Sequence, residues 1–326
     1  MVRRSSILTL PASPGPRNIL LRLHSTAGQA MLPRSIMQLD IFHDSRDVML
    51  RNELAQALQR RDAQAAQAAR KALATECPAD AALADAPTLL DSLSYFDAAP
   101  FTALAQVLQA RQAVREQVEP AAKRQFGEAA ADPWLSALWA SLAQRALELP
   151  YCRGDPQSYC APLWLRARDW DAAVEAVERI ESWWRIPAPL AWMARARWQI
   201  SGFDMALPLL VELAWVSPGR FGELARSLQD RRLGALLQRF DADFEGRGDS
   251  DDNAWFPAWL LTDQPRLSEL LVAARPSRGS PAERGCQLVM TLLSLERQGR
   301  HAELIEHRRR LKGLHEGLYR AYMKSR

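Results

Sequence analysis

The chain has 326 residues, of which 48% are apolar and 25% are charged, and its formal net charge is +4. Residues 1–36 hold five of the 42 basic residues and no acid, so the remaining 37 basic and 38 acidic residues carry a net charge of −1. This composition is typical of a well-cored globular protein, and the balanced charge after residue 36 excludes a general electrostatic attraction to nucleic acid or to an anionic membrane.

The residue types favour helices and offer no cofactor site. Only 15 glycines are present, Ala, Leu, Arg and Gln are abundant, and alternating β-branched runs are lacking. No stretch of ~20 apolar residues predicts a membrane span. Neither a CxxC pair nor histidines at zinc-site intervals accompany the four cysteines, which are Cys77, Cys152, Cys160 and Cys286. We therefore expect a cytoplasmic all-α protein with no metal and no cofactor.

The first 36 residues form a leader rich in Ser, Pro, Gly and Arg, which we expect to be disordered. Its acid-free composition is also typical of a mitochondrial transit peptide. We favour an over-extended gene start, with translation beginning at Met31 or Met37.

Residues 37–150 are expected to form N-terminal helical hairpins. Asp44 or Ser45 is predicted to cap a first helix, residues 60–62 to form a tight turn, and Pro78 to end the second helix. The apolar stripes of these helices are Leu50, Leu54, Leu58, then Ala66, Ala69 and Leu73. Asp132–Pro133 is predicted to begin another helix that continues to about Leu149. Its stripe is Trp134, Leu138 and Leu142.

Residues 151–242 are expected to form helical repeats, and the clearest internal repeat lies in residues 158–216. The segment Arg168–Val174, with the sequence RDWDAAV, recurs 33 residues later as SGFDMAL at Ser201–Leu207. Equivalent apolar positions follow each copy, namely Ala173, Val177, Ile180 and Ala206, Leu210, Leu213. Each copy contains a turn residue, an aromatic, an acid and a small residue in this order. The order resembles the turn between the two helices of a tetratricopeptide repeat, whose period is 34. The resemblance implies an α-solenoid of stacked antiparallel helical hairpins without a sheet.

Residues 243–253 are predicted to be an acidic linker, and residues 254–326 to be C-terminal hairpins. A helix over 282–297 is expected to end at Gly299, and a basic amphipathic helix from Arg300 is expected to cap the solenoid. The segment 241–252 approximates a calcium-binding EF-hand loop. However, Asp252 replaces the usual Glu and no second loop is present, so we do not predict a calcium site.

Two groups of residues are candidates for partner binding. The chain has eleven tryptophans, all between Trp134 and Trp259. Four of them could line a groove instead of filling the core, namely Trp183, Trp184, Trp192 and Trp198. Because neighbours on a helix point about 100° apart, we expect one of the adjacent pair to be exposed. The second group is the basic run Arg308, Arg309 and Arg310.

No sequence motif commits the chain to catalysis: HExxH, GxSxG and Gly-rich phosphate loops are all lacking. We therefore predict a non-enzymatic scaffold that binds a protein or peptide. Two alternatives stay open. One is an enzyme with a carboxylate-lined cavity that uses acids such as Glu175, Glu178 or Glu181, and the other is nucleic-acid association through the basic C-terminal helix.

Overall fold

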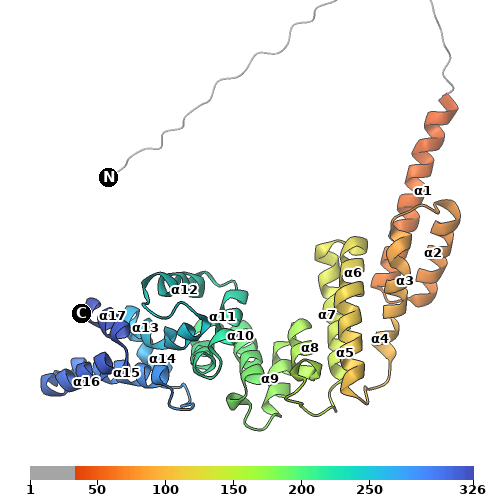
Figure 1. Ribbon diagram of the computed structural model, residues 1–326. Coiled ribbons are helices and arrows are strands. Elements are labelled where there is room, and N and C mark those ends of the chain that lie inside the picture. Colours follow the sequence, from red (N-terminus) through yellow and green to blue (C-terminus); the bar gives the residue numbers. More distant parts are fainter. Residues whose placement is uncertain (1–33) are drawn as a thin grey trace, which may run out of the picture. The chain divides into compact units, whose positions relative to one another are not determined.

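The computed structural model describes the backbone of residues 34–326 and the side chains of residues 46–326 (Figure 1). Every regular element in this part of the chain is a helix, which confirms the all-α prediction. Contacts divide the chain into two units, Met1–Arg46 and Asp47–Arg326. The predicted leader lies outside the described residues except for its last three, which begin the first helix.

The helices are named in chain order. The first group is α1 (Arg34–Gln59), α2 (Ala63–Glu76), α3 (Ala82–Ser92), α4 (Ser94–Asp97), α5 (Leu104–Ala113), α6 (Glu119–Phe126) and α7 (Glu128–Arg145). The middle group is α8 (Cys160–Arg166), α9 (Trp170–Glu178), α10 (Pro187–Val216), α11 (Pro218–Ser227) and α12 (Arg231–Asp243). The last group is α13 (Phe256–Asp263), α14 (Ser268–Leu271), α15 (Pro281–Gln298), α16 (His301–Leu314) and α17 (Glu316–Lys324). Short turns join them: the π turn η1 (Val114–Val118) and the 3₁₀ turns η2 (Pro156–Ser158), η3 (Trp183–Arg185), η4 (Ser250–Trp255) and η5 (Pro265–Leu267).

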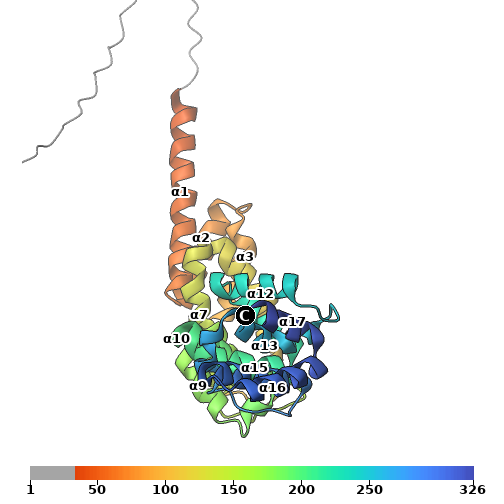
Figure 2. The ribbon, with the colours of Figure 1, turned by 90° about the vertical axis from the view of Figure 1, so that its left-hand side faces the viewer.

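Within the second unit, most helices pack on their neighbours in the sequence. Contacts join α2 to α3, α6 to α7, α7 to α8, α8 to α9, α9 to α10 and α10 to α11. At the C-terminal end, α13 also packs against α15 and α17, and α16 lies beside α15 (Figure 2). The buried apolar side chains form one cluster that extends from Leu54 to Tyr322.

The first hairpin has the predicted turn and stripes but a different start. The α1 helix begins at Arg34 and runs through Asp44 and Ser45, so the predicted cap at those residues is wrong. The reason is that residues 34–43 contain neither Gly nor Pro, and nothing local interrupts a helix that begins after Pro33. Asp62 caps α2 by accepting a hydrogen bond from the Ala65 N–H at 2.9 Å. The predicted stripe residues of α1 and α2 are buried except Leu50, which is half-buried.

The α7 helix also begins earlier than predicted. It starts at Glu128, directly after Gly127, and Asp132–Pro133 lies inside it. Gly127 has a φ of 78°, a left-handed value that ends α6 and that glycine adopts without strain. Pro133 is the sixth residue of α7, so the helix lacks the N–H that would otherwise donate to the Ala129 carbonyl. The predicted stripe of Trp134, Leu138 and Leu142 is buried.

Both copies of the repeated segment form a turn that contains a residue with a positive φ. Asp169 caps α9 by accepting a hydrogen bond from the Ala172 N–H at 3.0 Å, after a left-handed residue at Arg168. In the second copy, Gly202 interrupts α10 with a φ of 76° and a ψ of −166°. All six predicted apolar positions that follow the two turns are buried, which confirms the two stripes.

One helix in the described residues is long and apolar enough to cross a membrane by length and composition, namely α10. No such stretch was predicted from the sequence, so α10 corrects that prediction as far as length and composition are concerned. The break at Gly202 divides α10 into two segments, each shorter than the ~20 residues that a bilayer requires. Both α9 and α11 pack against α10.

The C-terminal part contains the predicted long helix but not a single capping helix. The α15 helix ends at Gly299, whose φ of 68° places it in the left-handed region, as predicted for a C-cap. The expected helix from Arg300 is two helices, α16 and α17, separated by His315 with a φ of −159°. The break is stabilised because the His315 Nδ1 accepts a hydrogen bond from the Leu318 N–H at 3.0 Å and so caps α17.

His315 makes the stability of this corner depend on pH. Burial lowers the pKa of His315, and the nearby charges of Asp252 and Glu245 raise it by less. Its ring lies 4.4 Å from that of Trp255 and 5.1 Å from that of Phe244. Since the folded state favours the neutral ring, the unfolded state binds the proton more readily. The contribution of His315 to stability is therefore present above its ordinary pKa of ~6.5 and is lost as the pH falls below it.

We expect thermal melting to show this loss between pH 7 and pH 5. His315→Asn keeps a side-chain acceptor for the α17 cap but does not titrate in this range. The melting temperature of the natural chain should therefore fall more steeply on acidification than that of the variant. Parallel curves for the two proteins would contradict the assignment.

Candidate functional site

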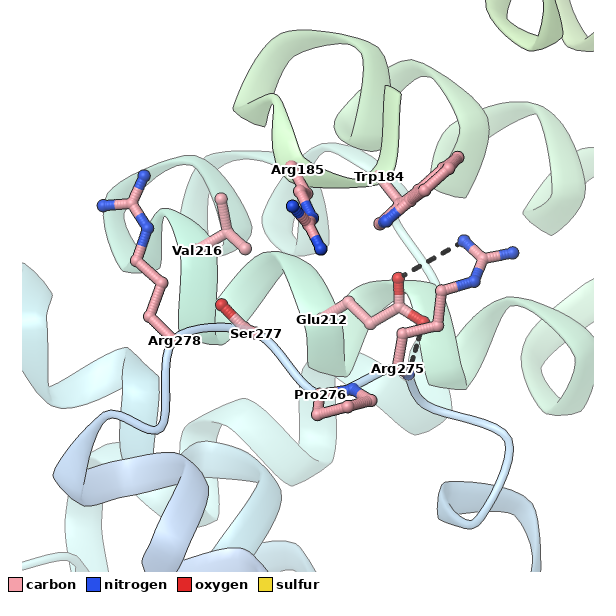
Figure 3. A pocket seen from close by; sticks show the side chains of 8 residues that line it. All are labelled: Trp184, Arg185, Glu212, Val216, Arg275, Pro276, Ser277 and Arg278. Carbon is pink, nitrogen blue, oxygen red and sulfur yellow. Dashed lines mark hydrogen bonds and ion pairs between the residues drawn. The ribbon is translucent and has the colours of Figure 1, made fainter. Parts of the chain in front are cut away.

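A cavity of about 350 Å³ lies between η3, α10 and the loop that follows α14 (Figure 3). The turn η3 contributes an aromatic and a basic side chain, α10 an acid, and the loop two more arginines. The residues that line it are Trp184, Arg185, Glu212, Val216, Arg275, Pro276, Ser277 and Arg278.

The adjacent tryptophans do not lie on a regular helix, which corrects the predicted geometry. Ser182 has a left-handed φ of 53° and turns the chain into the short 3₁₀ turn η3. The rings of Trp183 and Trp184 are edge to face, with centroids 5.9 Å apart. Trp183 is buried, whereas Trp184 is partly exposed and lines the cavity.

Arg275 joins the aromatic pair to the acid. Its guanidinium lies 5.0 Å from the ring centroid of Trp183 and 5.3 Å from that of Trp184, within cation–π range. Its backbone N–H donates a hydrogen bond of 2.8 Å to the Glu212 Oε1. Its Nη1 lies 3.8 Å from the Glu212 Oε2, which is an ion pair but too long for a hydrogen bond.

Glu212 is the chemically unusual group of the cavity. Its side chain is only 4% exposed, and its Oε2 accepts no hydrogen bond from the described residues. Burial raises the pKa of Glu212, and the hydrogen bond and charge of Arg275 lower it by less. A buried carboxylate oxygen without a donor is costly, so this oxygen is a ready acceptor for an N–H or O–H group that enters the cavity.

Glu283 holds the loop that forms the cavity wall, although it does not line the cavity. This buried carboxylate accepts hydrogen bonds from the Ser277 N–H at 2.9 Å and from the Gly279 N–H at 2.8 Å. The Glu283 N–H in turn donates to the Ser280 Oγ at 3.2 Å. Glu283 is not among the functional residues predicted from the sequence. The signal was present as a Ser-Pro-Ala-Glu segment at 280–283, which is the spacing of a capping box.

The other predicted tryptophans lie apart from this cavity. Trp192 is buried, stacks on Tyr159 with centroids 6.4 Å apart, and lines a different concavity. Trp198 is buried and packs edge to face on Phe203 at 5.7 Å. Of the four predicted tryptophans, only Trp184 therefore lines the Glu212 cavity, and Trp183 packs against its ring.

The predicted basic run lies on α16 and is largely paired with acids. Arg308 forms an ion pair of 3.4 Å with Glu296. Arg309 and Arg310 share Glu306, at 3.3 Å and 3.1 Å. These pairs reduce the free positive charge that this face of α16 presents.

The acidic segment 241–252 uses its carboxylates within the loop. Asp252 accepts hydrogen bonds from the backbone N–H groups of Arg247 and Gly248, at 2.9 Å and 2.6 Å. Asp249 accepts one from the Asp251 N–H at 2.9 Å. Within residues 46–326, no group of three or more His, Cys, Asp or Glu side chains is placed so that it could hold a metal ion.

We compared the chain with protein-family models, curated proteins and solved structures, and none of them matches it significantly.

Proposed function

We propose that this protein is a non-enzymatic, cytoplasmic helical-repeat scaffold that binds a segment of a protein or peptide partner in the cavity beside Trp184. The observation that carries the proposal is the buried Glu212 Oε2, which faces a partly open cavity and accepts no hydrogen bond from the described residues. A partner that supplies a donor there would satisfy a group that the chain leaves unsatisfied.

The proposed architecture is a stack of hairpins similar to tetratricopeptide repeats. Its support is the 33-residue recurrence, in which each copy has a turn with a positive φ followed by buried apolar positions at equivalent places. The successive contacts from α7 through α11 also fit hairpins that bury their apolar faces on their neighbours.

The cavity chemistry indicates the kind of segment that would fit. Glu212 would accept from the side-chain amide of an asparagine or glutamine, because Arg185, Arg275 and Arg278 give the lining a net positive charge that disfavours a basic side chain. The exposed edge of Trp184 would pack against the aliphatic part of that side chain. Arg185 and Arg278 also line the cavity and can donate to backbone carbonyls or to acids beside the inserted side chain. The cavity thus combines a tryptophan and several arginines around a desolvated acceptor. Tryptophan and arginine are frequent in the hot spots of protein interfaces.

A peptide-display selection on the full chain tests this function. We expect the enriched peptides to share an asparagine or glutamine, and Trp184→Ala and Glu212→Gln each to weaken their binding by about tenfold or more. Glu178→Gln is the matched control, because Glu178 is exposed and pairs with Arg197 outside the cavity. Binding should be measured by calorimetry, and the melting temperature of each variant should be recorded to show that it is folded.

The proposal fails if no peptide is enriched. It also fails if the enriched peptides bind the folded Trp184→Ala and Glu212→Gln variants as tightly as the natural chain.

The two alternative functions receive less support. Glu175, Glu178 and Glu181 are exposed, and Glu212 is the only acid that lines the Trp184 cavity, whereas a paired-carboxylate mechanism requires two. Nucleic-acid association through α16 would have to compete with the ion pairs that Arg308, Arg309 and Arg310 already make.

A further inference from the structure

A second concavity, of about 430 Å³, contains a cluster of arginines. Four separate helices each contribute one: Arg111 from α5, Arg166 from the end of α8, Arg195 from α10 and Arg220 from α11. Glu223 is the only acid among the lining residues. These five side chains thus carry a net charge of +3 in a confined space.

These four arginines lack the acidic partners that other arginines of the chain have. Arg124 binds Asp85 through two hydrogen bonds, and Arg239 binds Asp263 in the same way. In contrast, none of the four cluster arginines forms a hydrogen bond or an ion pair with any acid among residues 46–326. Asp155 attracts Arg111 only as a more distant charge.

The cluster is therefore electrostatically frustrated in the free protein. Burial lowers the pKa of Arg111, and the charges of Arg115 and Arg166 lower it further. Burial and the charge of Arg166 also lower the pKa of Arg195. Yet the side chains of Arg166 and Arg195 are open to solvent, as expected for groups on the wall of a concavity. Like charges on a concave wall concentrate a positive potential that attracts anions.

We propose that this arginine-lined concavity binds a ligand that carries two or more phosphoryl groups. Phosphoryl groups bring several negative charges into a small volume, and the planar guanidinium fork matches their oxygens. An acidic peptide would need at least three carboxylates to balance the same net charge, each on its own side chain and spaced along a backbone. Pro162, Leu165 and Leu224 are apolar residues on the same wall, and they would contact an uncharged part of the ligand.

Calorimetry on the full chain tests the site, with inorganic tripolyphosphate as the probe at low ionic strength. Tripolyphosphate should bind at least about tenfold more tightly than orthophosphate, and its affinity should fall as salt is added. Arg166→Gln and Arg195→Gln should each weaken its binding by about tenfold. Arg266→Gln should leave it unchanged, because Arg266 is exposed on η5 and does not line this concavity.

Thermal melting of the free variants provides a second readout. Removing one of several mutually repelling charges should raise the melting temperature of the free protein by about 2 °C for Arg195→Gln. A clear fall in melting temperature would show that Arg195 has stabilising contacts and would overturn the inferred repulsion.

Three results would overturn the ligand assignment. The first is that tripolyphosphate does not bind at a concentration of about 1 mM, because a dissociation constant above this value would be too weak for a specific site. The second is unchanged affinity in both arginine variants. The third is tighter binding of a glutamate-rich peptide than of tripolyphosphate, which would assign the concavity to an acidic protein segment. Because the Trp184 cavity shares no residue with this site, these results leave the peptide proposal unaffected.

Discussion

Replacing Glu283 with alanine should release the loop 275–280 and lower the free energy of unfolding by about 2 kcal/mol. The variant loses the carboxylate that accepts from the Ser277 and Gly279 N–H groups, at 2.9 Å and 2.8 Å. It also leaves a small void where a side chain with 1% exposure was packed. Because Arg275 and Arg278 belong to this loop, the Trp184 cavity should lose its wall and its peptide affinity together.

Amide hydrogen exchange is the most direct measurement of this effect. In Glu283→Ala, the amides of Ser277 and Gly279 should exchange faster, while those of α7 should be unchanged. Glu283→Gln is the matched control: its amide oxygen can still accept one of the two hydrogen bonds, so about half of the loss is expected. Unchanged exchange at Ser277 and Gly279 in the alanine variant would show that the loop is held by other contacts.

Replacing Phe256 with alanine should have the larger effect on stability, a loss of about 4 kcal/mol. Phe256 is 1% exposed and lies at the centre of an aromatic cluster at the start of α13. Its ring centroid is 5.2 Å from that of Phe221, 5.5 Å from Phe240 and 6.1 Å from Trp259. The substitution removes these contacts and leaves a cavity that rings held by α11 and α12 cannot fill easily.

Urea unfolding followed by tryptophan fluorescence measures this loss. Val272→Ala is the control, because Val272 is 72% exposed and its truncation should change stability by less than about 0.5 kcal/mol. If Phe256→Ala and Val272→Ala had similar midpoints, the aromatic cluster would not be the stabilising centre of this region.

The sequence predicted which faces of the helices are buried. Leu54 and Leu58, or Ala173 and Val177, recur at the spacing of one helical face, and burial of such a face follows from the spacing alone. Turns were equally local: Asp62 and Gly299 act through their own neighbours in the chain, so their roles were visible without a structure. Several errors occurred at helix boundaries, such as the start of α7 and the break at His315, because local signals do not specify the terminal residue of a helix.

Part of the candidate site was also visible in the sequence. Adjacent Trp183 and Trp184 indicated that one indole would be accessible, and Trp184 is partly exposed. Nothing in the sequence connected that pair to Glu212 or to Arg275. Glu212 occupies a position on an apolar helix where a polar residue has no evident role, and Arg275 is one of many arginines.

The amino-acid sequence by itself thus determined the all-α class, the buried stripes and the local turns, because each depends on residues within about two helical turns of one another. Only the tertiary structure decided which side chains meet. Arg275 reaches Glu212 across 63 residues, and the four cluster arginines converge from four helices. Helical periodicity specifies the face that is buried but not the helix that covers it, so both sites arise only when the helices pack together.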